Sequence, residues 1–367
     1  MKLSDIHYDC KHFQGHIPCK PNKIEPVACP DCSHYSPISK RILIIKLGAI
    51  GDVIRTTPLL TRYRAEYPNC HITWLTLSPA VLPKEQIDRI YKPDALSLFI
   101  LQNETFDIAL NLDKDKEACM LLKQVDAKEK YGFTWENGHI DAATDKAEHK
   151  LLTGFFDHLS IKNTKNYLEE IFEICHFDFR NEDYLINIDK ALVAKWKQIF
   201  QTENTEGKPI IGLNTGCGAR WQTRLWPEQY WVDFIKRLQN AGYFPVLLGG
   251  EQEDHQNRIY HQETGAYYPG HFSLAEFIAL SDSCDIIVTQ VSMMMHIAIA
   301  LKKELLLFNN IFNKYEFELY GRGMIVEPVS GCDCYYGNTC SRERRCMHDL
   351  SVDTVFDAAE ALKEKTL

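Results

Sequence analysis

The sequence predicts an α/β protein with two doubly wound, Rossmann-like domains that face each other across a cleft, preceded by a cysteine-rich extension. Two observations carry this prediction. Strand and helix patterns alternate twice along the chain, first from residue 41 to about residue 133 and again from residue 209 to residue 308. Such alternation is typical of a parallel sheet with helices on both faces. The length of 367 residues is also ordinary for two domains.

The first series opens with the stretch Arg41–Leu60, RILIIKLGAIGDVIRTTPLL. Its apolar run Ile42–Ile45 suits a strand that is covered on both faces. Gly48 and Gly51 then let the backbone turn tightly into a helix. Asp52 stands at the helix start, beyond the carboxyl end of the strand, where open α/β sheets bind ligands. From this stretch alone, a ligand-facing carboxylate and an ordinary acid of the first helical turn are equally supported.

The remaining elements are predicted from the same patterns. In the first series, strands are expected at His71–Leu77, Phe106–Leu112 and Lys128–Phe133, and helices at Pro79–Lys84, Asp94–Gln102 and Lys114–Gln124. Two helical runs, Leu151–Ile161 and Lys165–Phe177, lie in a region that we interpret as a lid or acceptor-side insertion. In the second series, strands are expected at Ile210–Asn214, Phe244–Leu248, Asp285–Thr289 and Glu304–Phe308. A linker around a helix at Lys190–Gln201 gives the expected divisions, which are 1–40, 41–187 and 188–367.

Composition excludes several classes of function. The net charge of −9 argues against a general nucleic-acid-binding protein. The first ten residues lack the apolar core of a signal peptide, and no run approaches the roughly 18 apolar residues that span a bilayer. We therefore expect a cytoplasmic protein, in which a few placed cations and backbone N–H groups bind any anionic ligand.

Eight of the 13 cysteines form two clusters at the ends of the chain. The clusters are Cys10, Cys19, Cys29 and Cys32, and Cys332, Cys334, Cys340 and Cys346 within segment 332–346. In a reducing cytoplasm such clustering favours metal ligation over disulfides. The Cys29-x2-Cys32 spacing is that of half a zinc site, which Cys10 and Cys19 would complete. Structural zinc and iron both remain open, because tetrahedral thiolate sites accept either ion. A single site that draws cysteines from both ends is the alternative to two separate sites.

Four motifs resemble glycosyltransferase family 9, the ADP-heptose:lipopolysaccharide heptosyltransferases. They are KLGAIGDVIRTTPLL (Lys46–Leu60), GLNTGCGARWQTRLWP (Gly212–Pro227), LLGGEQE (Leu247–Glu253) and MMMHIAIALKK (Met293–Lys303). The resemblance covers roughly residues 41–362. It implies the GT-B fold and an inverting, metal-free transfer, with the acceptor on the N-terminal domain and the nucleotide sugar on the C-terminal domain. The second cysteine cluster also resembles a segment of autotransporter heptosyltransferases that carries a four-cysteine iron site.

On the acceptor side, the resemblance implies that Asp52 is the general base. A carboxylate suits this role because it accepts the proton late, as the acceptor hydroxyl becomes acidic in the transition state. Gly48 and Gly51 would form the turn that brings Asp52 to the cleft. Thr56 is either an acceptor contact or, as its position in a helix favours, a packing hydroxyl.

On the donor side, Arg224 occupies a position that the family usually fills with lysine, and it would neutralise the leaving diphosphate. Its alternative is an ordinary surface charge. Glu251 is either a ribose ligand or a first-turn helix acid, and His296 is either a phosphate or sugar contact or a core histidine. The full set of expected donor-binding residues is Thr215, Gly216, Gly218, Gly249, Gly250, Glu251, Ser292, Met293 and His296.

Two departures from the family pattern affect the donor side. The chain reads Gln290, Val291, Ser292 where relatives carry an acidic residue, and it has Asn309 near a turn where they carry glycine. We therefore hold two hypotheses. The first is transfer of a heptose-like sugar from an ADP-like donor to lipopolysaccharide, another surface glycan or a protein, by a protein that associates peripherally with the inner membrane. The second is a non-catalytic protein that binds a nucleotide sugar or a partner on the same fold.

Overall fold

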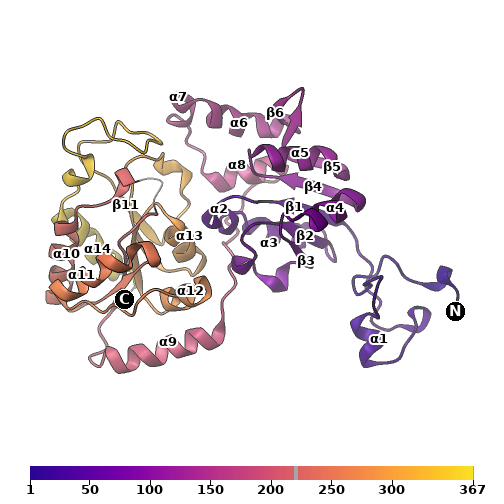
Figure 1. The fold of residues 1–367 in the computed structure, drawn as a ribbon, viewed down its shortest axis with the longest axis horizontal. Coiled ribbons are helices and arrows are strands. Elements are labelled where there is room, and N and C mark those ends of the chain that lie inside the picture. Colours follow the sequence, from indigo (N-terminus) through magenta and orange to yellow (C-terminus); the bar gives the residue numbers. More distant parts are fainter. Residues whose placement is uncertain (219–221, 367) are drawn as a thin grey trace.

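The computed structural model describes residues 1–218 and 222–366, and it contains two α/β halves that lie side by side (Figure 1). Each half is built on its own sheet. Ala219, Arg220 and Trp221, in the middle of the second motif, lie outside the described residues. The predicted α/β class with two sheets of parallel strands is confirmed.

The first sheet has six strands in the order β3-β2-β1-β4-β5-β6. The strands are β1 (Arg41–Ile45), β2 (His71–Leu75), β3 (Arg89–Tyr91), β4 (Thr105–Asn111), β5 (Asp126–Glu136) and β6 (His139–Ala142). Strands β1 to β5 are parallel, whereas β6 returns antiparallel to β5. Residues Ile42–Ile45 are fully buried, as expected for a strand with both faces covered. The sequence prediction missed β3 and β6, because three or four residues are too few to show a period.

Helices of the first half follow the strands. They are α2 (Ile50–Ile54), α3 (Pro58–Glu66), α4 (Ala95–Asn103) and α5 (Lys116–Gln124). The helix predicted at Pro79–Lys84 does not form. The chain there forms two 3-10 turns, Pro79–Val81 and Lys84–Gln86, because Pro83 has no N–H with which to continue a helix.

The insertion contains α6 (Glu148–Phe155), α7 (Asp157–Ser160) and α8 (Tyr167–Ile174). The predicted helix Leu151–Ile161 is therefore interrupted. Phe156 is extended, with φ −133° and ψ 109°, and it separates α6 from α7. The predicted helix Lys165–Phe177 is shorter than expected and begins after the capping side chain of Asn166, which accepts from the N–H of Glu169.

The second sheet is parallel throughout, in the order β11-β10-β9-β7-β8. Its strands are β7 (Ile210–Asn214), β8 (Phe244–Leu248), β9 (Ile286–Gln290), β10 (Glu304–Phe308) and β11 (Gly323–Val326). The predicted bounds of β7, β8 and β10 are confirmed, and β9 begins one residue late. The helices of this half are α10 (Glu228–Asn240), α11 (Asp254–Thr264), α12 (Leu274–Asp282), α13 (Met293–Ala300) and α14 (Val352–Thr366).

Helix α9 (Lys190–Glu203) connects the halves and packs on α12. The last helix, α14, packs on α10, β10 and β11, so it remains with the second half. The N-terminal segment with α1 (Lys20–Ile24) lies at the opposite end of the molecule, beyond the first sheet (Figure 1). The alternative prediction, a single metal site that draws cysteines from both clusters, is therefore wrong. Among the described residues, no helix is both long and apolar enough to cross a membrane.

Candidate active site

The two halves meet where α2 packs against α13. Gly51 makes this close approach possible: a Cβ built on it would lie 2.5 Å from Cδ2 of His296. The glycine turn predicted from the sequence therefore has a second purpose, which is contact between the halves. Asp52, the next residue, lies beside this contact.

Asp52 is bound by Arg55, whose Nη2 lies 2.7 Å from Oδ1. Burial by itself would raise the pKa of Asp52, but the charge of Arg55, followed by that of Lys46, outweighs burial and lowers the pKa to about 2. The guanidinium of Arg55 also stacks on Tyr167, with its central carbon 3.5 Å from the ring centroid. Asp52 is thus a carboxylate at neutral pH. It is paired with Arg55, and Tyr167 holds the Arg55 side chain in place.

A buried ion pair supports the glycine turn. Lys46 pairs with Asp113, and Asp113 accepts hydrogen bonds from the backbone N–H groups of Leu47 and Gly48, the latter at 2.9 Å. Both side chains of the pair are 5% exposed. Asp113 therefore fixes the backbone immediately before Asp52 from the neighbouring strand end. Lys46, Arg55 and Asp113 are not among the site residues predicted from the sequence. The signal available was their position, since Lys46 and Asp113 follow the ends of β1 and β4, and Arg55 directly follows α2.

Two other predicted site residues, Thr56 and His296, are buried in the fold. The Thr56 hydroxyl is fully buried and donates to the carbonyl of Asp52 at 2.8 Å, which favours its packing role. His296 is 8% exposed, and burial lowers its pKa to about 3, so its ring is neutral. Its ring stacks on Tyr184, and its Nδ1 has no hydrogen-bond partner among the described residues. His296 lies at the contact between the halves rather than in the pocket described next.

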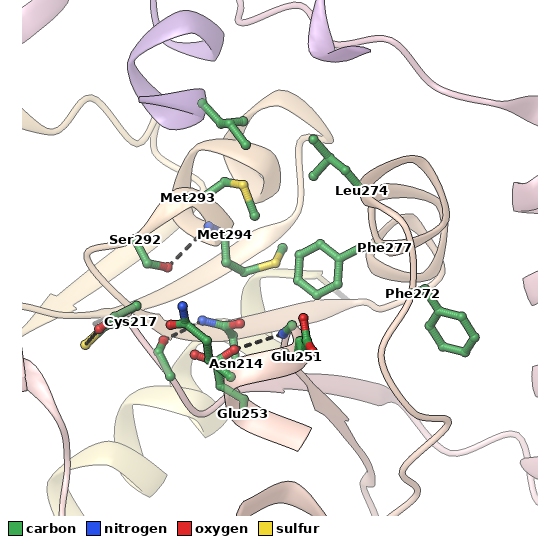
Figure 2. Close-up of a pocket in the computed structure, with 16 residues that line it drawn as sticks. Asn214, Cys217, Glu251, Glu253, Phe272, Leu274, Phe277, Ser292, Met293 and Met294 are labelled. Carbon is green, nitrogen blue, oxygen red and sulfur yellow. Dashed lines mark hydrogen bonds between the residues drawn. The ribbon is translucent and has the colours of Figure 1, made fainter. Parts of the chain in front are cut away.

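A pocket of about 470 Å³ opens at the carboxyl edge of the second sheet (Figure 2). Seven of the nine residues predicted to bind the donor line it, and only Thr215 and His296 do not. The seven are Gly216, Gly218, Gly249, Gly250, Glu251, Ser292 and Met293. Ile50 of α2 closes the pocket from the first half, so Asp52 lies two residues beyond a residue of the pocket wall.

The pocket has an apolar wall and a polar floor (Figure 2). The apolar wall is formed by Phe272, Leu274, Phe277, Met293 and Met294. On the floor, Glu253 accepts from the N–H of Gly250 at 2.9 Å and packs so closely on Gly216 and Gly249 that neither has room for a Cβ. Ser292 caps α13 by accepting from the N–H of Met294. Such a pocket suits a flat aromatic ring on one wall and an anion near the helix N-terminus.

Arg224 lies beside the pocket but does not line it. It is 5% exposed, its Nη2 donates to the carbonyl of Cys217 at 2.8 Å, and its guanidinium lies over the ring of Phe312. Burial lowers its pKa. The surface-charge alternative is therefore wrong. Thr215 is also buried, and its hydroxyl donates to Asn257.

The two departures from the family pattern do not fill the pocket. Val291 is 8% exposed and belongs to the main hydrophobic core. Asn309 is turned away, because its Nδ2 donates to the carbonyl of Phe312 and to Glu327. Neither Val291 nor Asn309 lines the pocket.

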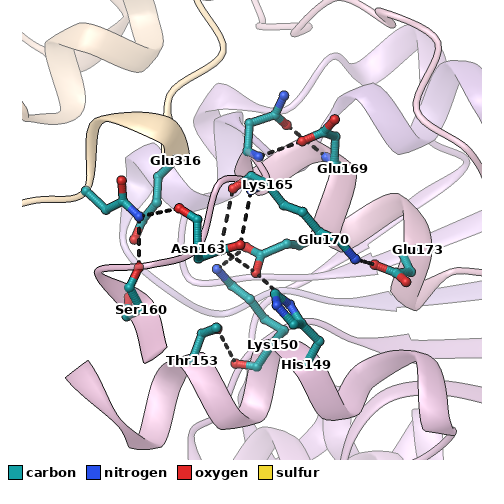
Figure 3. Close-up of polar contacts among 12 residues, drawn as sticks. His149, Lys150, Thr153, Ser160, Asn163, Lys165, Glu169, Glu170, Glu173 and Glu316 are labelled. Atoms are coloured by element: carbon teal, nitrogen blue, oxygen red, sulfur yellow. Dashed lines mark hydrogen bonds and ion pairs between the residues drawn. The ribbon is translucent and has the colours of Figure 1, made fainter. Parts of the chain in front are cut away.

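A polar network joins the insertion to the second half (Figure 3). Glu170 is 2% exposed, pairs with Lys150, and accepts from Nδ2 of Asn163 at 3.1 Å. From the second half, Nδ2 of Asn313 donates to the carbonyls of Ser160 and Asn163, at 2.8 and 2.7 Å. The network holds α6 to α8 as a wall beside Asp52, on the side expected to receive the acceptor.

The thiols of the C-terminal cluster lie in contact with one another. Cys332 donates to Cys346, and together with Asn310 and Arg342 this lowers the pKa of Cys346 to about 6. Cys334 contacts both Cys332 and Cys340. Within residues 1–218 and 222–366, no three His, Cys, Asp or Glu side chains form, in their observed positions, a group that could hold a metal ion.

Comparison with known proteins identifies the family. The model of "Glycosyltransferase family 9 (heptosyltransferase)" matches residues 100–310, more than half of the chain. Lipooligosaccharide heptosyltransferase 2 of Haemophilus influenzae is 23% identical over 317 residues, which is 79% of this chain and 89% of that protein.

Two solved structures share the fold. The E. coli ADP-heptose lipopolysaccharide heptosyltransferase II matches with a TM-score of 0.64 and 15% identity, over 89% of this chain and 99% of that one. The iron-containing dodecameric glycosyltransferase TibC of enterotoxigenic E. coli H10407 matches with a TM-score of 0.55 and 12% identity, over 90% of this chain and 77% of that one. Together with the matched family model, the two-sheet fold and the motif residues around its pocket, these findings show that the chain belongs to glycosyltransferase family 9.

Proposed function

We propose that this chain transfers a heptose-like sugar from a nucleoside diphosphate, ADP-heptose first among the candidates, to lipopolysaccharide, another surface glycan or a protein. One observation carries the proposal. Helix α2 supplies both Ile50, which lines the donor-side pocket, and Asp52, an ionised carboxylate beside that pocket. Family membership argues against the binding-only alternative.

The reaction follows from these positions. The Asp52 carboxylate accepts the proton of the acceptor hydroxyl as its oxygen bonds to the anomeric carbon. The bond from that carbon to the diphosphate oxygen breaks, and the nucleoside diphosphate leaves with the electron pair. Attack from the Asp52 side, opposite the leaving group, inverts the anomeric centre. Transfer of this kind needs no metal ion, because hydrogen-bond donors and cations of the protein stabilise the departing charge.

The donor pocket fits a nucleoside diphosphate in two parts. The apolar wall around Phe272 and Phe277 suits the adenine ring, and Glu251 is placed for a ribose hydroxyl. The N–H groups near Gly216 and the N-terminus of α13 suit the diphosphate. Arg224 supports the Cys217 carbonyl in the observed arrangement, and a rotation of its side chain would bring its charge to the leaving phosphate.

The acceptor side carries cations that suit an anionic glycan. Lys114 lies against Gly154 of α6, and burial, followed by Lys150, lowers its pKa. Among the described residues, Lys114 makes no hydrogen bond or ion pair, whereas Lys46 and Lys150 are each paired with an acid. We propose that Lys114 binds a carboxylate or phosphate of the acceptor.

We also propose that the protein works in the cytoplasm, at the inner membrane surface. Large apolar side chains of α6, α7 and the adjoining turns are exposed beside the acceptor wall. They are Leu152, Phe155, Phe156, Leu159 and Ile161, from 36% to 54% exposed. Such a patch favours interfacial binding. The chain should sediment with vesicles of phosphatidylethanolamine and phosphatidylglycerol, and the variant Phe155→Ser, Phe156→Ser should not. Equal sedimentation of both proteins would contradict this part of the proposal.

We propose a structural iron or zinc ion on Cys332, Cys334, Cys340 and Cys346. Mutual contact of these thiols supports the proposal, since four thiolates are a complete tetrahedral set. Asn310 connects this cluster to the donor side, because its Nδ2 donates to the carbonyl of Thr223 and to the sulfur of Cys346. The ion would hold this segment beside Arg224 and take no part in transfer.

The donor assignment is tested by thermal shift with ADP-, UDP- and GDP-linked sugars. A ligand that binds only the folded state raises Tm by mass action, so ADP-heptose should raise it most. With deacylated lipopolysaccharide core added, ADP should be released above the acceptor-free blank. Release of no nucleotide from any donor of the panel, with acceptor present, would contradict the proposed transfer.

A further inference from the structure

The N-terminal segment gathers metal-binding side chains around one small cavity. Cys10, Cys19, Cys29 and Cys32 all line a space of about 30 Å³. Three histidines, His7, His12 and His34, line the same space. None of the four cysteines is in a disulfide. Because these residues are spread over 28 positions of the chain, 7 to 34 inclusive, their convergence is a property of the folded segment.

This segment has almost no core of its own. Of residues 1–40, only Pro21 is buried, and the helical pieces are the five residues of α1 and two 3-10 turns, Leu3–Asp5 and Cys29–Asp31. Yet the backbone is tied together, since Lys11 donates to the carbonyl of Ser36 and Ile38 to that of Asp9, both at 2.8 Å. So short a stretch without apolar burial ordinarily needs a metal ion or disulfides to keep its shape.

Local geometry supports ligation at the cavity. The N–H of Cys32 donates to the carbonyl of Cys29 at 3.2 Å, which forms the tight turn of a Cys-x2-Cys half-site. The N–H of Tyr35 continues the turn by donating to the carbonyl of Cys32. Nδ1 of His7, on the cavity wall, is buried and has no partner among the described residues. A buried polar atom of this kind is costly unless something in the cavity accepts or ligates it.

We propose that Cys10, Cys19, Cys29 and Cys32 bind one Zn²⁺ or Fe²⁺ ion, at a site separate from the C-terminal cluster. The four thiols lose their protons on binding, and their side chains turn from the cavity wall towards the ion. His7 then donates from its free ring nitrogen to a thiolate, the usual support of a ligand by a neighbouring group. The ion fixes the fold of residues 1–40 and is remote from the transfer reaction, so the proposal stands independently of the proposed function.

Anaerobic titration of the chelator-treated full chain with Co²⁺ tests this site, because thiolate ligation produces an intense charge-transfer absorption. The variant Cys29→Ser, Cys32→Ser should bind one equivalent less than wild type. Two controls are matched: Cys119→Ser, Cys284→Ser removes two buried thiols outside both clusters, and Cys332→Ser, Cys340→Ser removes the other cluster only. The first control should bind as wild type does, and the second should retain the N-terminal equivalent. His7→Ala should weaken Co²⁺ binding about tenfold. Elemental analysis of the untreated protein then distinguishes zinc from iron.

Equal Co²⁺ uptake by Cys29→Ser, Cys32→Ser and by wild type would overturn the proposal. Should that variant fail to fold, proteolysis of the wild-type chain decides instead. Chelation should expose residues 1–40 to cleavage several-fold faster, whereas unchanged cleavage within residues 1–40 would refute the site. Absence of transfer from protein with normal metal uptake would count against the proposed function alone. Co²⁺ uptake by Cys29→Ser, Cys32→Ser that equals that of wild type, with transfer intact, would count against this inference alone.

Discussion

Among single residues, Asp52 is central to the proposed transfer, because it must be ionised and lie beside the donor pocket. Arg55 and Lys46 lower its pKa to about 2 against the effect of burial. Such a carboxylate is a weak base in the ground state, so proton transfer must occur late, when the acceptor oxygen has already begun to bond. Neutral His296 beside it adds no competing charge.

Replacing Asp52 with Asn should remove transfer and retain binding. The amide keeps the shape but accepts no proton, so kcat should fall by about 100-fold or more. The Kd for ADP, measured by calorimetry, should change less than twofold, because the donor pocket is intact. Asp233→Asn, the same change at an exposed position of α10, serves as the control. Equal kcat for Asp52→Asn and Asp233→Asn would remove Asp52 from the mechanism.

Replacing Arg55 with Gln should move the acid limb of the pH profile. Without the ion pair, burial dominates and the pKa of Asp52 rises, so the carboxylate becomes protonated at a higher pH. In the wild type, protonation of Asp52 should not lower kcat/KM until the pH approaches about 2. In Arg55→Gln the corresponding fall should begin at least about one pH unit higher, while Arg55→Lys should stay near wild type. Identical acid limbs for Gln and Lys variants would contradict the assigned role of Arg55.

Among the helices and strands, the sequence patterns predicted those whose bounds are set by a regular pattern of buried side chains. The bounds of β7, β8 and β10 agree because each is a short apolar run between polar turns. The helix expected at Pro79–Lys84 failed because an apolar pattern does not compensate for Pro83. The residues that support the Asp52 turn and Arg55 were also missed: Asp113, which binds Gly48, follows the end of β4, and Tyr167, which stacks on Arg55, comes from the insertion. No local pattern records contacts made across the fold.

Gly51 should be required for the packing of α2 on α13. A methyl group there would overlap the His296 ring, so Gly51→Ala should lower the free energy of unfolding by about 1–3 kcal/mol. Urea denaturation of both single variants and of Gly51→Ala, His296→Ala gives the coupling between the positions. The double variant should be less destabilised than the sum of the singles. Strict additivity would mean that the ring is not what opposes the methyl group.

In the whole molecule, the two halves are joined by packing of α2 on α13 and by the hydrogen bonds of Asn313 to the insertion. Asn313 comes from the second half, and its amide satisfies two backbone carbonyls of the insertion in the first. The acceptor wall is therefore positioned by the half that is expected to bind the donor. This arrangement couples the two sides of the cleft.

Asn313→Ala should loosen the acceptor wall. The variant loses both hydrogen bonds to the insertion and a third that Oδ1 accepts from the N–H of Tyr315. The free energy of unfolding should therefore fall by about 1–3 kcal/mol, and hydrogen exchange of residues 156–166 should increase. Asn103→Ala removes only a local bond to the carbonyl of Phe99 on α4, so it is the matched control. Unchanged exchange of residues 156–166 in Asn313→Ala would show that other contacts position the wall.

The anomeric configuration of the product shows from which face the acceptor hydroxyl attacks. Wild-type protein, ADP-heptose and a lipopolysaccharide-core acceptor should give a glycoside whose anomeric configuration, read by NMR coupling constants, is opposite to that of the donor. Inversion is required because the Asp52-activated hydroxyl attacks the face opposite the diphosphate. A product with the donor's configuration, or no product above the enzyme-free blank, would contradict the account.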